Sequence, residues 1–359
     1  MRIDTFDYEL PPERIAQRPA EPRDAARLLV LGDQGYEHKT VADLPGLIPQ
    51  GSLVIVNDTR VFPARLIGQK AKTGGKVEIF LLQNAGPRTI PVEDGTRNVE
   101  IWRALGKSSK PLRFGTDVIA GSLTVHLIGR SEDGLLEVGL SAPPGTSIND
   151  AIHEAGRVPL PPYIHRDPEA NDAERYQTVF ARIEGAVAAP TAGLHLTHGL
   201  LGRLALRDCE VASVTLHVGL GTFQPVSVED LDQHPMHSES YEISRSTADA
   251  IARARTRNAP VVAIGTTVVR ALESAATDEG LVTPTRGDTR LLIQPGYRFR
   301  VVDRLMTNFH LPKSTLLAMV SAFAGTGRVL EAYKTAVDEK YRFYSYGDAM
   351  LLSRAEPPQ

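Results

Sequence analysis

Short hydrophobic runs that alternate with polar positions dominate residues 61–145 of the chain. In "SLTVHLIGR", apolar residues share one parity between positions 123 and 127 while polar residues take the other, and this period of two indicates a strand with one buried face. The pairs Gly74-Gly75 and Asp133-Gly134 separate such runs, as the turns of hairpins do. We therefore predict an all-β region of five or six strands, closed into a barrel because closure leaves no unpaired edge.

The pattern changes to helices alternating with buried strands from about residue 147. Ser147 and Asp150 form a candidate capping box, Gly156 is a candidate helix end, and Ser314 is a candidate helix N-cap. "PVVAIGTTVVRALESAA" predicts a strand at 261–264, a tight turn at Gly265 and an amphipathic helix.

Before the β region, "GSLVIVNDTR" also predicts a buried strand that ends in a polar cluster. The simplest fold class is thus an α/β main domain with an inserted all-β, barrel-like domain. Residues 1–60 and 150–359 form the discontinuous α/β domain, and residues 61–149 form the insertion.

Composition narrows the class of protein. The chain has 359 residues, 42% of them hydrophobic, and 40 basic residues nearly balance 43 acidic ones, so no global positive field attracts nucleic acid and any RNA contact needs a local patch. Cys209 is the single cysteine, which rules out an internal disulfide and fits a reducing cytosol. With neither a signal peptide nor a membrane span in the sequence, we expect a cytoplasmic protein.

Polar clusters follow several of the predicted strands or glycine turns. These are "NDTR", "PTAGLHLT", "LHVGLGTF" and "TNFHLP", with "HPMHSESY" as a fifth. Ligands of open α/β sheets bind beyond the carboxyl ends of the strands. The clusters are therefore expected to converge on one pocket.

The histidine beside the glycine turn of "TLHVGLGTFQPV" allows three interpretations. A phosphate site is weakly supported, because Gly219 and Gly221 lack the third glycine of a dinucleotide fingerprint. A metal site draws on the pairs His195 with His198 and His234 with His237, both spaced i, i+3, although neither shows HExxH. A nucleoside pocket and ordinary hydrogen-bonded histidines are the remaining interpretations.

Arg270 and Glu273 are expected on the exposed side of their helix, either as a surface ion pair of little consequence or with Arg270 assisting an anion site. In the second case Thr266, Thr267 and the free N–H groups of the helix N-terminus bind the anion.

Two further clusters are ambiguous between structure and RNA binding. "RFRVVDR", with Arg298 and Arg300, is either a solvated strand face or a contact to a phosphate backbone. "EKYRFYSYGDAM" places several aromatics around Arg342, either as core or as a surface that stacks on a base.

Taken together, these stretches resemble the S-adenosylmethionine:tRNA ribosyltransferase-isomerases of queuosine biosynthesis over essentially the whole length. The resemblance rests on "NDTRVFPARL", "PLPPYI", "YQTVFA", "GAVAAPTAGLHLT", "TLHVGLGTFQPV", "MHSESYEI", "IGTTVVRALES", "TNFHLPKSTLLAMVSAFAG" and "YRFYSYGDAM". Departures are small: Leu196 stands where an aromatic is expected, and "TRLLIQPG" replaces a more aromatic segment.

The resemblance implies an α/β domain with an inserted barrel and an unusual reaction. The ribose of S-adenosylmethionine is transferred and isomerised onto 7-aminomethyl-7-deazaguanine at the wobble position of a tRNA, which yields epoxyqueuosine and releases adenine and methionine. No metal or redox cofactor is implied, and we expect a monomer that binds tRNA and S-adenosylmethionine. A metal-dependent hydrolase and a noncatalytic RNA-binding module are the alternative functions.

The clusters and the resemblance together supply the candidate residues. As acids and bases we predict His217, His195, His237, Glu239 and His310. For substrate binding we predict Asp58, Arg60, Thr191, Gly219, Gly221, Thr222, Thr266, Thr267, Arg270 and Asn308. For tRNA binding we predict Arg298, Arg300 and Arg342, and we expect no metal ligands.

Overall fold

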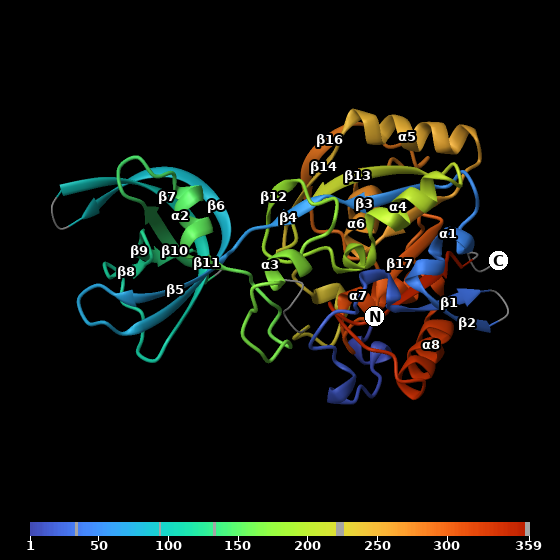
Figure 1. Cartoon of the computed structure of the whole chain (residues 1–359), viewed down its shortest axis with the longest axis horizontal. Helices are drawn as coiled ribbons and strands as arrows, with labels where there is room; N and C mark the ends of the chain where they lie inside the picture. Colours follow the sequence, from blue (N-terminus) through green and yellow to red (C-terminus); the bar gives the residue numbers. More distant parts are fainter. Residues whose placement is uncertain (33–34, 93–94, 132–133, 220–225, 356–359) are drawn as a thin grey trace.

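The computed structural model describes residues 1–32, 35–92, 95–131, 134–219 and 226–355, which form two lobes (Figure 1). The larger lobe is built on a nine-stranded mixed sheet and the smaller one on a seven-stranded antiparallel sheet; a two-stranded ribbon is the third sheet. The chain is thus a mixed α/β structure with several sheets. In the described part, no helix is long and apolar enough to cross a membrane.

The nine-stranded sheet has four parallel strands at its centre. In spatial order it comprises β16 (Thr285–Thr289), β14 (Glu239–Ile243), β13 (Glu210–Leu216), β3 (Leu53–Asn57), β15 (Val261–Ile264), β17 (Arg304–Asn308), β18 (Ala349–Ser353), β1 (Arg27–Gly32) and β2 (Gly35–Thr40). The run β13-β3-β15-β17 is parallel, and antiparallel pairs at β13–β14, β14–β16, β17–β18 and β1–β2 flank it. The predicted strands at 53–57 and 261–264 are confirmed in this parallel centre.

Helices cover both faces of this sheet. They are α1 (Leu44–Leu47), α4 (His198–Ala205), α5 (Arg245–Thr256), α6 (Thr266–Ala275), α7 (Thr315–Ala324) and α8 (Thr326–Asp338). The short helix α3 (Asp172–Arg175) lies in the segment that follows the smaller sheet. Leu53, Ile55 and Ala263 pack with α5 to α8, whereas the intervening Val54 and Val262 pack with α1 and α4. A period of two along the strands therefore divides two hydrophobic cores between the two faces.

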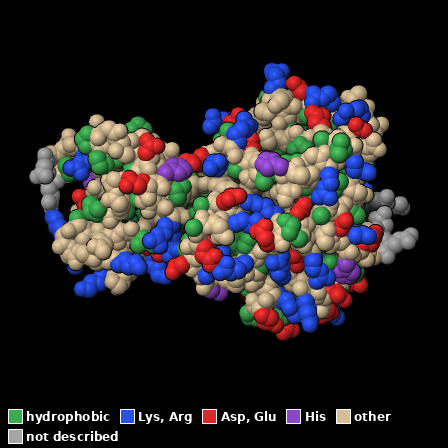
Figure 2. All heavy atoms as spheres, in the orientation of Figure 1, with side chains coloured by type: hydrophobic (Ala, Val, Ile, Leu, Met, Phe, Trp, Pro, Cys, Tyr) green, Lys and Arg blue, Asp and Glu red, His purple; other side chains and the backbone are tan. Residues whose placement is uncertain are grey.

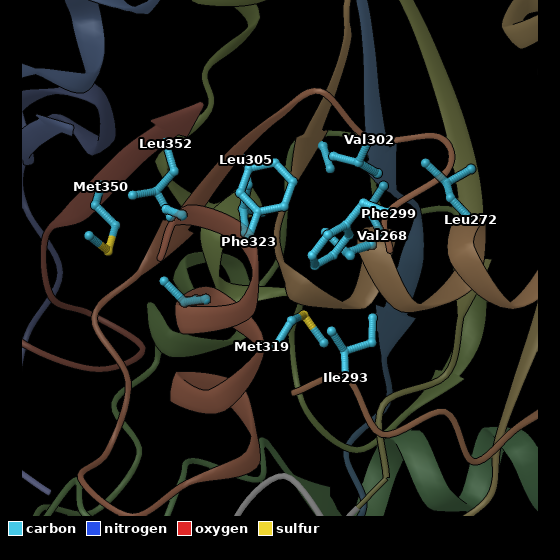
Figure 3. Packing of buried hydrophobic residues seen from close by; sticks show 14 of the residues in the cluster. Val268, Leu272, Ile293, Phe299, Val302, Leu305, Met319, Phe323, Met350 and Leu352 are labelled. Carbon is cyan, nitrogen blue, oxygen red and sulfur yellow. The ribbon is translucent and has the colours of Figure 1, made fainter. Parts of the chain in front are cut away.

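The larger of these cores joins α6 and α7 to the sheet. Figure 3 shows Val268 and Leu272 of α6 near Phe299 and Val302, with Met319 and Phe323 of α7 beside them. The predicted apolar stripe of α6 is confirmed, and Ser314 caps α7 as expected by accepting a hydrogen bond from Leu317 N. These contacts hold the N-termini of α6 and α7 at fixed places beside the sheet.

The smaller lobe is formed by residues 65–157, which we call the β lobe. It contains β5 (Arg65–Lys70), β6 (Lys76–Val92), β7 (Gly95–Ser108), β8 (Asp117–Ala120), β9 (Leu123–Arg130), β10 (Leu136–Ser141), α2 (Ile148–Ala155) and β11 (Gly156–Arg157). The sheet runs β11-β5-β6-β7-β10-β9-β8, and β5 pairs with β8 as well.

Local signals in the β lobe are largely confirmed. Gly74-Gly75 lie in the turn between β5 and β6, Ser147 caps α2, and Gly156 ends that helix. Asp133 of the second predicted turn lies outside the described residues. Between the lobes runs the ribbon of β4 (Thr59–Val61) and β12 (Ile183–Ala186), whose strands pair in parallel.

A buried carboxylate fastens the segment that returns from the β lobe to the main lobe. Asp172 accepts hydrogen bonds from Arg166 Nη1 and Nη2 at 2.6 and 2.8 Å, from Glu169 N at 2.7 Å and from the Tyr346 hydroxyl at 2.9 Å. Burial raises the pKa of Asp172, but these hydrogen bonds outweigh it and hold the pKa below 3.8. The ionised carboxylate is therefore the form that stabilises the fold.

Asp172→Asn is expected to lower the free energy of unfolding by about 3 kcal/mol at pH 7, because it leaves the Arg166 guanidinium without its buried partner. A depressed carboxyl pKa stabilises the fold above the unfolded value and ceases to do so as pH falls through the folded value. The difference between variant and wild type should thus shrink below about pH 3.8. Urea unfolding at pH 7 and pH 3 measures this, with the exposed Asp249→Asn as control; a difference that does not change with pH would contradict it.

Candidate active site

A cavity of about 350 Å³ lies at the carboxyl ends of the central parallel strands. Its walls come from the segment after β15, the segment after β17, Val218 after β13, and the first residue of β14. The loop at 188–192 and the segment at 344–345 complete them. Four of the five predicted polar clusters therefore converge here, as expected for ligand sites in open α/β sheets, while "NDTR" contributes no lining residue.

The structure brings only part of the predicted set to this cavity. Lining it are Thr191, His237, Glu239, Thr266, Thr267, Arg270, Asn308 and His310. Not among its lining residues are His195, His217, Asp58, Arg60, Gly219, Arg298, Arg300 and Arg342. Gly221 and Thr222 lie outside the described residues.

Arg270 occupies a buried position at the wall of the cavity. Its side chain is 8% exposed, its Nη1 pairs with Glu239 Oε2, and its Nε donates to Leu291 O at 3.2 Å. Glu239 Oε1 in turn accepts from Gly219 N at 3.3 Å. Among the described residues, the buried Nη2 of Arg270 has no hydrogen-bond partner, so this donor is left for a ligand.

The prediction that Arg270 and Glu273 share an exposed helix side is wrong. Glu273 is buried and accepts from the backbone N–H groups of Arg300, Val301 and Val302 at 2.8 to 3.2 Å. Helix α6 is covered on that side by β14, β16 and the 290–302 segment. Each charge therefore needs its own partner, and the two do not pair with each other.

Two helix N-termini open toward the cavity. Helix α6 begins after Gly265, whose φ of 99° lies in the region that glycine tolerates best, and no described side chain caps this helix. Lys313, which precedes the cap of α7, also has a positive φ of 52°. Residues with a positive φ occur often at functional sites. The N-terminus of α6, which has no side-chain cap, attracts an anion.

An aromatic wall forms another side of the cavity. The rings of Tyr163 and Tyr344 are 4.6 Å apart between centroids at an angle of 38°, and the Tyr163 hydroxyl shares a 2.6 Å hydrogen bond with Ser345 Oγ. Neither tyrosine was a predicted site residue. "PLPPYI" and "YRFYSYGDAM" contain them, but nothing in the local pattern indicates that two tyrosines 181 residues apart lie in contact.

The histidines of the cavity differ in environment. His310 shares a 2.8 Å hydrogen bond between its Nε2 and Thr307 Oγ1, its carbonyl accepts from the Tyr8 hydroxyl at 2.6 Å, and burial lowers its pKa to about 3. The side chain of His237 is exposed at the rim. His310 is therefore neutral at pH 7, while the side chain of His237 is exposed to solvent.

His195 lies behind the cavity wall. It is 5% exposed, and its Nε2 lies 3.1 Å from Nδ2 of Asn308, which also donates to Tyr344 O at 3.1 Å. Burial lowers the pKa of His195 to about 4, so its Nε2 accepts at pH 7. Since Nδ2 is held by acceptors, Asn308 presents Oδ1, which is buried and has no partner among the described residues. His195 orients Asn308 and does not itself line the cavity.

His217 and Asp58 form a second polar cluster beside the β4–β12 ribbon. His217 Nδ1 lies 2.8 Å from Thr59 Oγ1, and its ring approaches Gly185 so closely that a Cβ there would lie 2.7 Å from Cε1. Asp58 accepts from Arg182 at 2.7 Å and from the hydroxyls of two β13 residues. Arg60 is exposed on the same ribbon.

One residue that sequence analysis missed connects this cluster to the cavity. Asn57, at the end of β3, donates to Leu216 O at 2.9 Å and to Thr267 Oγ1 at 3.2 Å. Its Oδ1 accepts from the N–H groups of Thr59 and Leu216. The letters "NDTR" contained it, but its role depends on strand neighbours that only the fold reveals.

Within the described residues no group of three or more His, Cys, Asp or Glu side chains could hold a metal ion. The pairs His195 with His198 and His234 with His237 therefore lack a third protein ligand there. Thr197, not His198, caps α4.

The chain is an α/β protein with a cavity of small-ligand size beyond the carboxyl ends of its parallel strands. A profile of the family described as "Queuosine biosynthesis protein" matches residues 3–352, and the chain belongs to that family.

Several proteins that are similar to the chain over nearly their full length carry the name S-adenosylmethionine:tRNA ribosyltransferase-isomerase. One from Sorangium cellulosum is 58% identical, covering 100% of both chains, and one from Moorella thermoacetica is 47% identical, covering 98% and 100%. The crystal structure of S-adenosylmethionine tRNA ribosyltransferase from Thermotoga maritima is 34% identical, with a TM-score of 0.52 and coverage of 97% and 99%.

The depressed pKa of His195 predicts a pH dependence of stability. Between the unfolded value of 6.5 and the folded value of about 4, only the unfolded chain binds this proton, so the free energy of unfolding falls as pH falls, by up to about 1.4 kcal/mol per pH unit. His195→Gln removes this one titrating group, so it should reduce the slope by up to about 1.4 kcal/mol per pH unit.

Denaturant unfolding at intervals from pH 4.5 to pH 7 measures the slope. The exposed His198→Gln is the control and should follow wild type. If the curves of His195→Gln and wild type run parallel over this range, His195 is not buried in its neutral form.

Proposed function

We propose that this chain is an S-adenosylmethionine:tRNA ribosyltransferase-isomerase. It transfers and isomerises the ribosyl group of S-adenosylmethionine onto 7-aminomethyl-7-deazaguanine at the wobble position of tRNA. Epoxyqueuosine-tRNA forms, and adenine and methionine leave. The observation that carries this function is the cavity of nucleoside size in which the strand-end clusters of the family converge.

The methionine carboxylate is bound by Thr266, Thr267 and Arg270. Support comes from the uncapped start of α6 and from the partnerless Nη2 of Arg270, both at the cavity wall. A helix N-terminus and a guanidinium together satisfy a carboxylate well. Glu239 neutralises Arg270 and donates no proton in this scheme, so it acts as a positioning residue.

The aromatic wall of Tyr163 and Tyr344 stacks on a base. Asn308 Oδ1 and Thr191 lie along the same cavity and provide contacts to the nucleoside.

The sulfonium of the donor acidifies the neighbouring C5′ protons, so a positioned base starts an elimination that opens the sugar ring and expels adenine. His237 is the favoured base, because it lines the cavity and its side chain is exposed to solvent. His310, with a pKa of about 3, suits a neutral hydrogen-bonding partner better than a proton acceptor. The wobble amine then attacks, and closure to the epoxide-bearing cyclopentane expels methionine.

The reaction in this scheme requires no metal or redox cofactor, since the sulfonium already supplies positive charge at the reacting carbon. Residues 61–149 act as an inserted barrel-like domain, supported by the pairing of β5 with β8 at the two sides of one sheet. The chain works as a cytoplasmic monomer with tRNA as its macromolecular substrate.

The function is tested by incubating the full chain with S-adenosylmethionine and tRNA in the presence of a chelator. Adenine and methionine should appear in equal amounts only when the wobble base is 7-aminomethyl-7-deazaguanine, with a matching mass increase of the tRNA. Release without tRNA would indicate a hydrolase. Loss of turnover on chelation, restored by zinc, would indicate a metalloenzyme.

Arg270→Ala should weaken binding of S-adenosylmethionine by about 1 to 3 kcal/mol, because a hydrogen-bonded charge contact to the carboxylate is lost. Calorimetry of donor binding and filter binding of tRNA measure the two affinities, and tRNA affinity should stay unchanged. Arg286→Ala, on the exposed face of β16, is the matched control. Arg270→Ala leaves the Glu239 carboxylate without its partner, and combining it with Glu239→Gln removes that carboxylate. If the double variant binds the donor normally, the methionine carboxylate of the donor is bound elsewhere.

His237→Ala should lower the single-turnover rate of adenine release by about 100-fold or more at saturating substrates, the scale of general acid–base catalysis. The same measurement on His310→Gln and His217→Ala ranks the other candidate bases. His198→Ala serves as an exposed control. If His237→Ala retains its rate and His217→Ala loses it, the proton moves through the cluster at the β4–β12 ribbon.

A further inference from the structure

Two turns at one end of the β lobe lie side by side. The turn between β5 and β6 meets the segment between β7 and β8, since Ala71 N donates to Asp117 O at 2.9 Å and Lys70 Nζ approaches Pro111 O at 3.4 Å. β5 also pairs with β8 at Gln69 and Lys70. Side chains from both turns therefore share one surface.

That surface carries a cluster of cations, which we call the basic end: Lys76, Lys107, Lys110 and Arg113, all exposed. Within the described part of the chain, none of these four forms an ion pair. The nearby carboxylates have other hydrogen-bonded partners: Glu78 binds Arg65 at 2.8 Å, and Asp117 binds His126 at 2.7 Å. Glu78 also interacts electrostatically with Lys107 and Lys76, without forming an ion pair with either. Figure 2 shows Lys and Arg side chains gathered along the lower edge of the β lobe, where these turns lie in Figure 1.

An exposed aromatic side chain adjoins the cations. Phe114 follows Arg113 directly and is 53% exposed, although a phenylalanine is usually buried. Cations interleaved with an exposed aromatic ring are typical of surfaces that bind nucleic acid, where the cations meet phosphates and the ring stacks on a base.

Two of the three arginines predicted for tRNA binding have partners within the protein. Arg300 pairs with Asp278 at 2.7 Å and Arg342 with the buried Asp348 at 3.0 Å. Only Arg298 of the three is exposed. The main lobe thus offers little uncompensated charge from this set, while the basic end offers four cations.

We infer that the basic end of the β lobe binds the sugar–phosphate backbone of tRNA away from the anticodon nucleotide, with Phe114 stacking on an unpaired base. The inference rests on the proposed function, which makes tRNA the substrate. The cavity of the main lobe takes the wobble nucleotide, and the β lobe supplies electrostatic affinity that is independent of the chemistry.

The test uses the full chain with Lys107→Gln, Lys110→Gln and Arg113→Gln combined. Each released phosphate contact lowers the slope of log affinity against log salt by about 0.7 to 0.9, so the triple variant should lose about two to three units of slope. Its tRNA affinity should fall tenfold or more at low salt, while donor binding and adenine release at saturating tRNA stay unchanged. The control replaces Arg245 and Arg253 of α5 and Arg257, which follows this helix, with Gln and should keep the wild-type slope.

Phe114→Ala should weaken tRNA binding about 5- to 150-fold with no change in salt slope, the effect of one lost stacking contact. Phe114→Leu keeps an apolar side chain and should weaken it nearly as much if stacking is the cause.

An unchanged slope and affinity in the triple variant would overturn the inference even if wild type modifies tRNA normally. Absence of turnover by wild type would instead overturn the proposed function. Binding of wild type to phosphatidylserine vesicles, lost in the triple variant while tRNA affinity is kept, would assign the surface to a membrane and overturn the inference as well.

Discussion

The buried charge of Arg270 is the constraint on which the candidate site depends. A guanidinium removed from water is tolerated only with a counter-ion and further hydrogen bonds. Glu239, the first residue of β14, supplies the carboxylate, and Leu291 supplies a backbone carbonyl. The second carboxylate oxygen of Glu239 accepts a hydrogen bond from Gly219 N. One buried charge thus determines how β14, α6 and the end of β13 must meet.

The same need to satisfy buried polar groups organises the rest of the strand ends. Asn57 ties β3 to β13 and to the start of α6, and Asn308 ties β17 to His195 and to the segment after α8. Each side chain is held in place by the hydrogen bonds of its amide group. The unpaired atoms that remain, Nη2 of Arg270 and Oδ1 of Asn308, belong to two residues that line the cavity.

Local patterns in the sequence were sufficient to predict strands, helices and helix caps. They were insufficient to predict which charged residues are buried. The strand at 261–264, the turn at Gly265 and the cap at Ser314 depend on neighbours in sequence, and all three are confirmed. The exposure of Arg270 and Glu273 was predicted wrongly, because helical periodicity does not reveal that β14 and β16 cover the second side of α6.

The alternation of strands and helices was enough to predict that polar clusters meet at a cavity. It was not enough to predict toward which group each histidine side chain points. His195 faces an amide and His217 faces Thr59, each through contacts with a distant segment.

A cavity of about 350 Å³ has the size of a small-molecule site, so only a small part of a tRNA enters it. The wobble base must leave its neighbours in the anticodon loop to reach the donor, which costs least where the strand is already unpaired. Contacts inside the cavity must serve the donor and this base together, and they leave little surface for affinity to the rest of the nucleic acid. Binding energy for the macromolecule therefore has to come from outside the cavity, and phosphate contacts far from the reacting atoms provide it without altering the geometry of the reaction.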